Sequence, residues 1–240
     1  MKILLIDAGN SRVKWALAQG GLWLQQGVVE NAQVSTLGAT FSALPPPHKI
    51  LVSNVAGEAM AQQLRTACGA WSLPLTFISA LAEQCGIRNS YQPATQLGSD
   101  RWAALIGARQ QERSACLVIN CGTATTIDAL SAQGEFLGGL ILPGVDMMQR
   151  SIAGVVQPRQ PAGSWQQFPR NTADALFTGA IQATLGAIHL QFESLAEHTA
   201  RCVLSGGAAH KIQAHLKLPL IQIDNLVLHG LQIIGQQSPG

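Results

Sequence analysis

The apolar residues of this chain fall into short runs that are separated by polar or glycine-containing turns. Continuous apolar runs of about four to eight residues are typical of buried strands, and apolar residues spaced three or four apart are typical of helices. Strands are predicted over residues 2–7, 12–19, 21–29, 49–55, 75–79, 116–121, 124–130, 135–142, 201–205 and 219–223. Helices are predicted over residues 31–43, 56–69, 101–113, 145–153 and 172–198, after residue 209, and from residue 225. Loops are predicted over residues 80–99 and 155–171.

One part of this pattern occurs twice. Residues 4–17 align with residues 117–130 at an offset of 113 residues, and each copy is a strand, a polar turn around a glycine, and a second strand. Strands that alternate with helices in both halves are typical of an α/β fold. The repeat therefore predicts a duplicated α/β fold with a nucleotide site between two related domains, residues 1–114 and 115–240.

The composition limits the possible functions. Of the 240 residues 47% are hydrophobic and only 12% are charged, and the net charge is +2. An average soluble domain carries about 25% charged residues, so the deficit suggests a surface that a partner subunit covers. There is no basic cluster of the kind that binds nucleic acid. No apolar run approaches the roughly 20 residues of a membrane span, and the start has no signal-peptide pattern, so we expect no membrane segment.

Several common motifs are absent from the sequence. It has no GxxxxGKS/T loop, no GxGxxG after the first strand, no GxSxG elbow and no HExxH helix. These absences argue against a Walker-type NTPase, a Rossmann dinucleotide-binding fold, an α/β-hydrolase and an HExxH metalloprotease. The five cysteines are odd in number and form no CxxC pair. This pattern disfavours a disulfide framework or a zinc site and fits a reducing, cytoplasmic setting.

The first copy of the repeat carries residues suited to phosphate and metal. Asp7 ends the first strand, and a carboxylate there can hold Mg²⁺ directly or through water. Gly9 permits close approach of the backbone to a ligand, while Asn10 and Ser11 offer hydrogen bonds to phosphate oxygens. A plain β-hairpin is the alternative, and the second copy of the pattern weakens it.

Small and hydroxyl residues occupy the corresponding parts of the second half. Thr123 lies in a run of threonines after Gly122, where it could contact nucleotide phosphates or be an ordinary strand-forming threonine. Gly206 and Gly207 follow the strand at 201–205 and open a helix. A flat ring could lie against their backbone, or they could form only a tight turn.

The segment from Gly98 to Arg101 joins the loop at 80–99 to the next helix. Ser99 or Asp100 could cap that helix, with Arg101 facing solvent. Alternatively, Asp100 is a general base beside a cation, because kinases need a carboxylate that orients the substrate hydroxyl and accepts its proton.

Together these motifs resemble the type III pantothenate kinases. They occur in the order of that family: Asp7 with Gly9, Asn10 and Ser11, then Tyr91 and Pro93, Gly98 to Arg101, Gly122 to Thr126, Gly138-Gly139 with Pro143-Gly144, Asn171-Thr172, and Gly206-Gly207. The first two phosphate motifs are shared with the wider actin-like ATPase and sugar-kinase superfamily. The resemblance implies a duplicated actin-like ATPase (ribonuclease H-like) fold with a nucleotide cleft between two domains.

The resemblance also implies an activity and a set of site residues. The activity is ATP-dependent phosphorylation of pantothenate to 4'-phosphopantothenate, the first step of coenzyme A biosynthesis, in a cytoplasmic homodimer. Asp100 would be the proton acceptor, and Asp7 would lie near Mg²⁺. The residues that would bind ATP are Asp7, Ala8, Gly9, Asn10, Ser11, Arg12, Val13, Lys14, Thr123, Gly206 and Gly207. Those that would bind pantothenate are Tyr91, Gly98, Ser99, Asp100, Arg101 and Thr172.

One residue departs from the pattern of the family. Relatives usually have Asp where this chain has Asn120, and that Asp coordinates a monovalent cation such as K⁺ or NH₄⁺. Asn keeps a carbonyl oxygen but lacks the negative charge, so the resemblance implies a cation that binds weakly or is dispensable.

Two other functions stay open at this stage. One is a kinase for another small hydroxylated substrate, because the loop at 80–99 sets the substrate and its pattern does not reveal which. The other is a nucleotide-binding accessory or regulatory protein, since some proteins that resemble this family are described as accessory factors in transcription. Asp7, Asp100 and Arg101 together favour catalysis.

Overall fold

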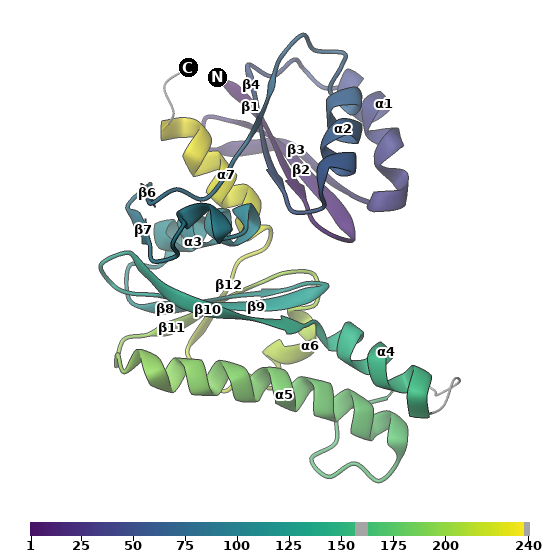
Figure 1. Ribbon diagram of the computed structural model, residues 1–240, viewed down its shortest axis with the longest axis vertical. Coiled ribbons are helices and arrows are strands. Elements are labelled where there is room, and N and C mark those ends of the chain that lie inside the picture. Colours follow the sequence, from purple (N-terminus) through teal and green to yellow (C-terminus); the bar gives the residue numbers. More distant parts are fainter. Residues whose placement is uncertain (157–162, 238–240) are drawn as a thin grey trace. The chain divides into compact units, whose positions relative to one another are not determined.

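The structure is a computed structural model that describes residues 1–156 and 163–237 (Figure 1). The chain forms two compact units, each described by itself. The first comprises Met1–Gln111, Gly134–Phe136 and Asn225–Gly240, and the second comprises Glu112–Gln133 and Leu137–Asp224. The predicted domain boundary at residue 114 stays a prediction. These units differ from it chiefly because the last helix belongs to the first unit.

The first unit is built on a five-stranded sheet with the order β3-β2-β1-β4-β5. β1 pairs antiparallel with β2 and parallel with β4. The strands are β1 (Lys2–Ala8), β2 (Arg12–Gln19), β3 (Leu22–Glu30), β4 (Lys49–Asn54) and β5 (Leu75–Phe77), with the short strands β6 (Glu83–Gln84) and β7 (Ile87–Asn89) outside this sheet. The helices are α1 (Leu37–Ser42), α2 (Glu58–Ala67), α3 (Ser99–Gln111) and α7 (Leu226–Gln237).

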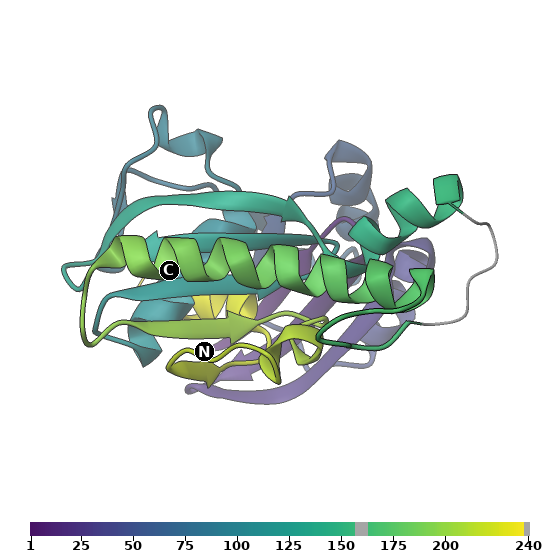
Figure 2. The ribbon, with the colours of Figure 1, turned by 90° about the horizontal axis from the view of Figure 1, so that it is seen from below.

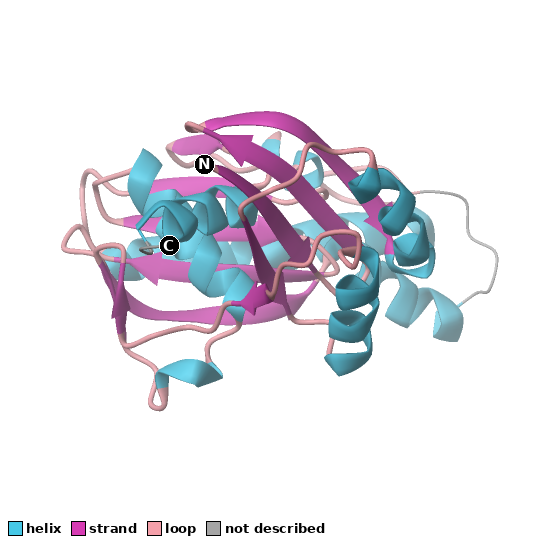
Figure 3. Cartoon of the chain, turned by 90° about the horizontal axis from the view of Figure 1, so that it is seen from above, coloured by secondary structure: helices cyan, strands magenta, loops and turns pink. Residues whose placement is uncertain are grey.

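Each face of this sheet packs against a different pair of helices. Leu4 and Ile6 of β1 share a core with Phe41 of α1 and Leu64 of α2, so they point to the face that these two helices cover. Figure 3 shows helices beside the strands of this sheet. The alternate residues of β1 point the other way, because successive side chains of a strand face opposite sides. On that side the side chain of Ile3 lies against Gly235 of α7.

The second unit repeats this strand order. Its strands follow the order β12-β11-β8-β9-β10, with β8 in the place of β1, and β8 pairs antiparallel with β9 and parallel with β11. The strands are β8 (Cys116–Cys121), β9 (Ala124–Leu130), β10 (Glu135–Pro143), β11 (Arg201–Ser205) and β12 (Leu220–Gln222). The first residues of β10 belong to the first unit, where they pair with β7. The predicted duplication is therefore present in the strand order.

Helices α4 (Val145–Val156), α5 (Thr172–Leu195) and α6 (His210–Gln213) complete the second unit. The long helix α5 runs along β8 and β9, as Figure 2 shows. Its buried Ile181 and Ile188 pack with Leu117, Ile119 and Ile127 of the sheet. No helix within the described ranges is both long and apolar enough to cross a membrane.

Most predicted elements agree with the structure, and two segments differ. Residues 31–43 form a 3₁₀ helix (Asn31–Thr36) followed by the short helix α1, in place of one continuous helix. The loop predicted over 80–99 contains β6, β7 and a 3₁₀ turn (Ala94–Gln96). Part of the loop predicted over 155–171 lies outside the described residues.

Helices α3 and α7 pack against each other through glycines. A Cβ atom on Gly230 of α7 would lie 1.8 Å from the carbonyl oxygen of Ala103 in α3, and one on Gly107 of α3 would lie 2.6 Å from the carbonyl oxygen of Leu226. No side chain fits at such distances, so the two backbones approach closely because both positions lack a Cβ.

We expect Gly230→Ala to lower the stability of the fold by more than about 2 kcal/mol, because the new methyl group forces the backbones of α3 and α7 apart. Urea unfolding followed by circular dichroism measures the change. Gly179→Ala on α5 is the matched control, since nothing lies within 4 Å of a Cβ there, and it should stabilise the helix by about 0.5–1 kcal/mol. Equal midpoints for Gly230→Ala and the wild type would contradict the close packing.

Candidate active site

A row of polar residues crosses the first sheet where β1 ends. In the register of the sheet, Asp7 of β1 lies opposite Lys14 of β2 and opposite Ser53 of β4. Residues that are paired in neighbouring strands point to the same face, with Cβ atoms about 5 Å apart. The carboxylate of Asp7 therefore has a cation on one side and a hydroxyl group on the other.

The turn that follows Asp7 is held by backbone and side-chain hydrogen bonds. The amide of Gly9 donates to the carbonyl of Arg12 at 3.0 Å. The side-chain amide of Asn31 donates to the carbonyl of Gly9, and the backbone amide of Asn31 donates to the carbonyl of Ser11, both at 3.0 Å. Asn31, which no motif singled out, thus braces the turn that sequence reasoning assigned to phosphate.

The run from Asp7 to Lys14 divides between two faces. Ala8 and Val13 are fully buried in the core beneath α1 and α2, so only their backbone is placed to meet a ligand. Arg12 is largely exposed and its Nε lies 2.8 Å from a carboxylate oxygen of Glu30. Asp7 and Lys14 are partly buried, whereas Asn10 and Ser11 are exposed at the tip of the turn.

The helix α3 places Asp100 at the same end of the sheet. Its first residue, Ser99, is buried, and its hydroxyl lies 2.9 Å from that of Ser53. This hydrogen bond ties the start of α3 to the strand that pairs with Asp7. A Cβ on Gly98 would lie 2.6 Å from a carboxylate oxygen of Asp100, so glycine leaves room for the carboxylate.

The capping role predicted for Ser99 or Asp100 is wrong, because both residues lie inside the first turn of α3. The amide of Trp102 donates to the carbonyl of Gly98 at 3.0 Å, which places Gly98 just before the helix. Asp100 instead accepts a hydrogen bond from the amide of Arg101 at 2.8 Å. A carboxylate in the first turn of a helix also benefits from the helix dipole.

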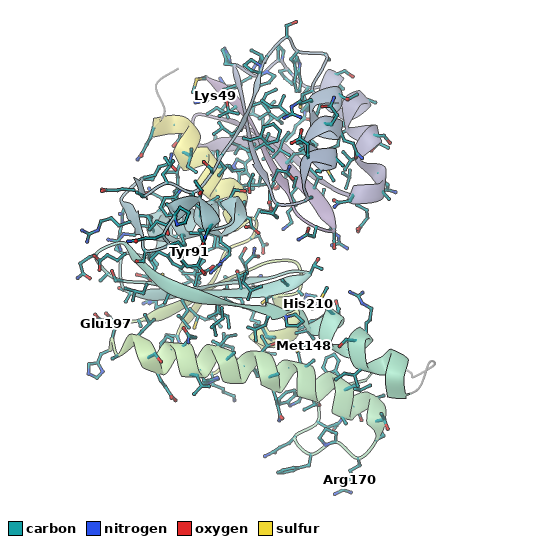
Figure 4. The ribbon with its side chains drawn as sticks, viewed as in Figure 1. Lys49, Tyr91, Met148, Arg170, Glu197 and His210 are labelled. Atoms are coloured by element: carbon teal, nitrogen blue, oxygen red, sulfur yellow. The ribbon has the colours of Figure 1, made fainter. Side chains whose placement is uncertain are left out.

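The side chain of Arg101 is buried, contrary to the alternative that it faces solvent. Only 6% of the residue is exposed. Its Nη1 donates to the hydroxyl of Tyr91 at 3.4 Å, and the Tyr91 amide is fixed by a 3.0 Å hydrogen bond to the side chain of Asn89. Figure 4 labels Tyr91, which lies on the segment that leads into α3.

Both carboxylates of this site have a raised pKa, and burial is the main cause for each. Burial raises the pKa of Asp7 to about 7; the negative charge of Asp100 adds to this effect, and the positive charge of Lys14 opposes it. Burial also raises the pKa of Asp100, against the lowering effect of the amide and the charge of Arg101. Acidic groups that share a partly buried site hold their protons more tightly. The site is therefore rich in negative charge that a bound cation would stabilise.

The second hairpin has a shorter turn than the first. Asp7 pairs with Lys14, seven residues further along, whereas Asn120 pairs with Thr126, only six residues further along. The offset of 113 residues between the two copies therefore does not hold after the turn. It predicts that Asn120 pairs with Ile127, the counterpart of Lys14, but Asn120 pairs with Thr126. As a result, the place of Lys14 is taken by the hydroxyl residue Thr126.

The turn around Thr123 packs closely against the glycines that surround it. The amide of Gly144 donates to the carbonyl of Thr123 at 2.9 Å. Gly206 has φ +99°, and a Cβ there would lie 2.2 Å from the carbonyl of Cys121. Glycine is therefore required at residue 206, where the next turn passes the end of β8. The structure brings Asn120, Thr123 and Gly206 to one end of the second sheet.

Thr172 is the first residue of α5 and is exposed. The residue that caps this helix is Asn171, whose side chain accepts a hydrogen bond from the Asp174 amide at 2.9 Å. Asn, like Thr, is a common capping residue, so the sequence placed the helix start within one residue.

The repeated sheet, with its duplicated strand order, is the actin-like fold, which solved structures of other proteins share. A putative 2-dehydro-3-deoxygalactonokinase from Sinorhizobium meliloti matches 98% of each chain with a TM-score of 0.62 and 15% identity. A conserved putative Baf family transcriptional activator from Campylobacter jejuni matches 97% of this chain and 98% of its own, with a TM-score of 0.64 and 23% identity. These likenesses confirm the predicted fold.

Sequence comparison then identifies the family. The family model for type III pantothenate kinase matches residues 3–194. The type III pantothenate kinase of Aromatoleum aromaticum is 47% identical over 239 residues, which is 98% of each chain. That of Nitrosospira multiformis is 42% identical over 240 residues, 98% of this chain and 92% of its own. The chain belongs to the type III pantothenate kinase family and is a kinase.

The raised pKa of Asp7 should make the stability of the folded protein depend on pH. Because the folded-state pKa of about 7 exceeds the unfolded value of about 3.9, ionisation favours unfolding as the pH rises from 4 to 7, and the penalty is complete above 7. We expect Asp7→Asn to stabilise the protein, without metal or nucleotide, by the order of 2 kcal/mol at pH 8 and by little at pH 4. Urea unfolding in EDTA at both pH values measures this.

Asp174→Asn is the control with the opposite sign. Hydrogen bonds from Ser164 and Asn171 lower the pKa of Asp174, so its carboxylate stabilises the fold above the unfolded pKa and this contribution is lost in acid. Its replacement should therefore destabilise the protein at pH 8. An Asp7→Asn effect that is the same at pH 4 and pH 8 would contradict the charge penalty.

Proposed function

We propose that this protein transfers a phosphoryl group from ATP to pantothenate, giving 4'-phosphopantothenate, the first step of coenzyme A biosynthesis. The observation that carries the proposal is the position of Asp100, a partly buried carboxylate with a raised pKa at the start of α3, tied through Ser99 and Ser53 to the strand beside Asp7. Family membership supplies the substrate.

In this proposal Asp100 orients the pantothenate hydroxyl and accepts its proton. A raised pKa makes a carboxylate a stronger base, and proton transfer is most effective when the pKa lies near the working pH. The amide of Arg101 holds one carboxylate oxygen in place, which leaves the other for the substrate. Tyr91, Gly98, Ser99 and Arg101 are proposed to line the pantothenate site of the first unit, and a pantothenate contact of Thr172 stays a prediction from the family resemblance.

The residues at the end of β1 fit a divalent cation. Among the described residues no three His, Cys, Asp or Glu side chains gather as metal ligands. Mg²⁺ suits such a place, because it is usually bound by one or two carboxylates, with waters and substrate phosphates completing its shell. Asp7 would hold it, and the positive charge of the ion would offset the burial and the charge of Asp100 that raise the pKa of Asp7. When bound, Mg²⁺ neutralises charge on the phosphates.

The polar turns are proposed to hold ATP. The turn from Gly9 to Arg12, with the neighbouring Lys14, offers amides and a cation to the phosphates. In the second unit, Thr123 would contact the phosphates, and Gly206 and Gly207 would lie along the adenine ring. A cytoplasmic location accompanies this proposal, because ATP is supplied there.

A homodimer is also proposed. Leu137 and Ile141 on β10 and Leu190 on α5 are exposed by 54%, 64% and 66%. Leu137 lines the same groove as Gln191 and Leu195 of α5, and Gln191 directly follows Leu190 in that helix. Exposed apolar surface of this kind marks interaction sites, and a second copy of the chain is the proposed occupant.

We expect the purified protein to release ADP from MgATP only when pantothenate is present. Asp100→Asn should lower kcat by roughly 10²- to 10⁴-fold, the usual contribution of a general base, while the unfolding midpoint is kept or raised. A coupled ADP assay measures the pantothenate dependence and kcat, and urea unfolding measures the midpoint. Glu58→Gln is the matched control, because the side chain of Glu58 is 80% exposed on α2, and it should not change kcat.

Other outcomes of the assay would point elsewhere. ADP release with a different hydroxylated substrate would indicate another small-molecule kinase. Nucleotide binding without turnover for any such substrate would favour a regulatory protein. Turnover by Asp100→Asn close to that of the wild type would rule out Asp100 as the base.

The residue Asn120 makes a separate prediction about K⁺. Its amide oxygen lacks the charge that attracts a monovalent cation, so we propose that activity is nearly the same in Na⁺, K⁺ and NH₄⁺ buffers. In contrast, Asn120→Asp should gain stimulation by K⁺, because it adds a carboxylate opposite the neutral Thr126. Initial rates with each chloride salt at equal ionic strength test this. Strict dependence of the wild type on K⁺ would contradict it.

A further inference from the structure

Phe136 lies against the candidate site, although none of the sequence motifs includes it. It is fully buried at the start of β10, in the part of that strand that belongs to the first unit. The guanidinium carbon of Arg101 lies 5.8 Å from the centre of its ring and 5.7 Å from that of Tyr91, and the two rings are 5.3 Å apart. The two distances from Arg101 to the rings fall within the roughly 6 Å range of cation–π attraction.

The burial of Arg101 makes these ring contacts important. Removing a cation from water costs free energy unless other groups compensate. Aromatic rings attract the faces of a guanidinium group through their negative faces, and they leave its edge, which carries the N–H groups, directed to hydrogen-bond acceptors. A leucine in place of Phe136 would fill space but would lack this attraction.

Hydrogen bonds fix Phe136 to the loop that carries Tyr91. The hydroxyl of Ser90 donates to the carbonyl of Phe136 at 2.5 Å, and Phe136 pairs with Asn89 in the register of β10 and β7. The side chain of Asn89 in turn accepts from the amide of Tyr91. Phe136 therefore contacts Arg101 through its ring and holds the Tyr91 loop through its backbone.

We propose that Phe136 is a positioning residue for pantothenate: its ring holds the Arg101 guanidinium and Tyr91 in the arrangement that binds the anionic substrate. This inference rests on the proposed function, because it assigns pantothenate to the site of Tyr91 and Arg101. It adds a residue from a distant part of the chain that acts through Arg101 and Tyr91.

Steady-state kinetics with full-length variants test the proposal. Phe136→Leu should raise KM for pantothenate by about tenfold, the scale of a desolvated cation–π contact. KM for ATP should change by less than about twofold, because the phosphate turns are untouched. Phe136→Tyr keeps the ring and should keep KM for pantothenate near the wild-type value. Phe41→Leu is the matched control, since Phe41 is equally buried but packs on Trp15 and Trp71.

A second measurement does not depend on turnover. Tyr91 is the single tyrosine of the chain, so labelling with 3-fluorotyrosine gives one ¹⁹F resonance that reports on this site. Pantothenate should shift the resonance of the wild type. Phe136→Leu should shift the resonance of the free protein and weaken the pantothenate titration by about tenfold, whereas Phe41→Leu should do neither. If Phe136→Leu does not fold, Arg101→Lys, which leaves Phe136 in place, should also shift the resonance.

The outcomes separate this inference from the proposed function. A wild type that releases no ADP with pantothenate, and whose resonance pantothenate does not move, would overturn the proposed function. An active wild type together with a Phe136→Leu variant of unchanged KM for pantothenate would overturn only the role of Phe136. An equal rise in KM for Phe41→Leu would also overturn it, because the effect would then be one of general stability.

Discussion

The hydrogen bond between Ser53 and Ser99 is the contact on which the candidate site depends. It is buried, and it joins a strand of the first sheet to the first turn of α3. Because Ser53 is also the register partner of Asp7, this one contact relates the position of the metal-ready carboxylate to that of Asp100. Neutral hydroxyls thereby hold two acidic groups that repel each other at one end of the sheet. The packing of α3 against α7 offsets the cost of this repulsion.

Much of the fold was predictable because its causes are local. The apolar runs of β1 and β8 are long enough to identify buried strands, and the turns between strands contain the glycines that such turns need. The repeat of the first hairpin led to the duplication, which the strand order confirms. Asp7 and Asp100 were found as candidates for the same reason: each carboxylate lies directly at the end or the start of a recognisable element.

The rest depended on contacts between distant parts of the chain. Phe136 meets Arg101 only because β10 begins beside β7, and Asn31 braces the first turn because β3 ends there. Neither contact leaves a pattern in the sequence. The shorter second turn was also missed, because an alignment without gaps cannot detect the loss of one residue when both flanking strands stay apolar. The burial of Arg101 was hidden for a similar reason, since arginine in the first turn of a helix is usually exposed.

The contact between α3 and α7 has a consequence for how the protein is made. Asp100 belongs to a helix whose packing partner is more than a hundred residues further along the chain, and the whole second unit is translated between them. Domains generally fold as units while the ribosome adds residues. The second unit has all its strands before α7 emerges, whereas the first unit must wait with an uncovered helix face. The order of synthesis thus delays completion of the first unit until the end, so a chain that stops before residue 226 carries every motif of the candidate site and lacks the helix that packs behind Asp100.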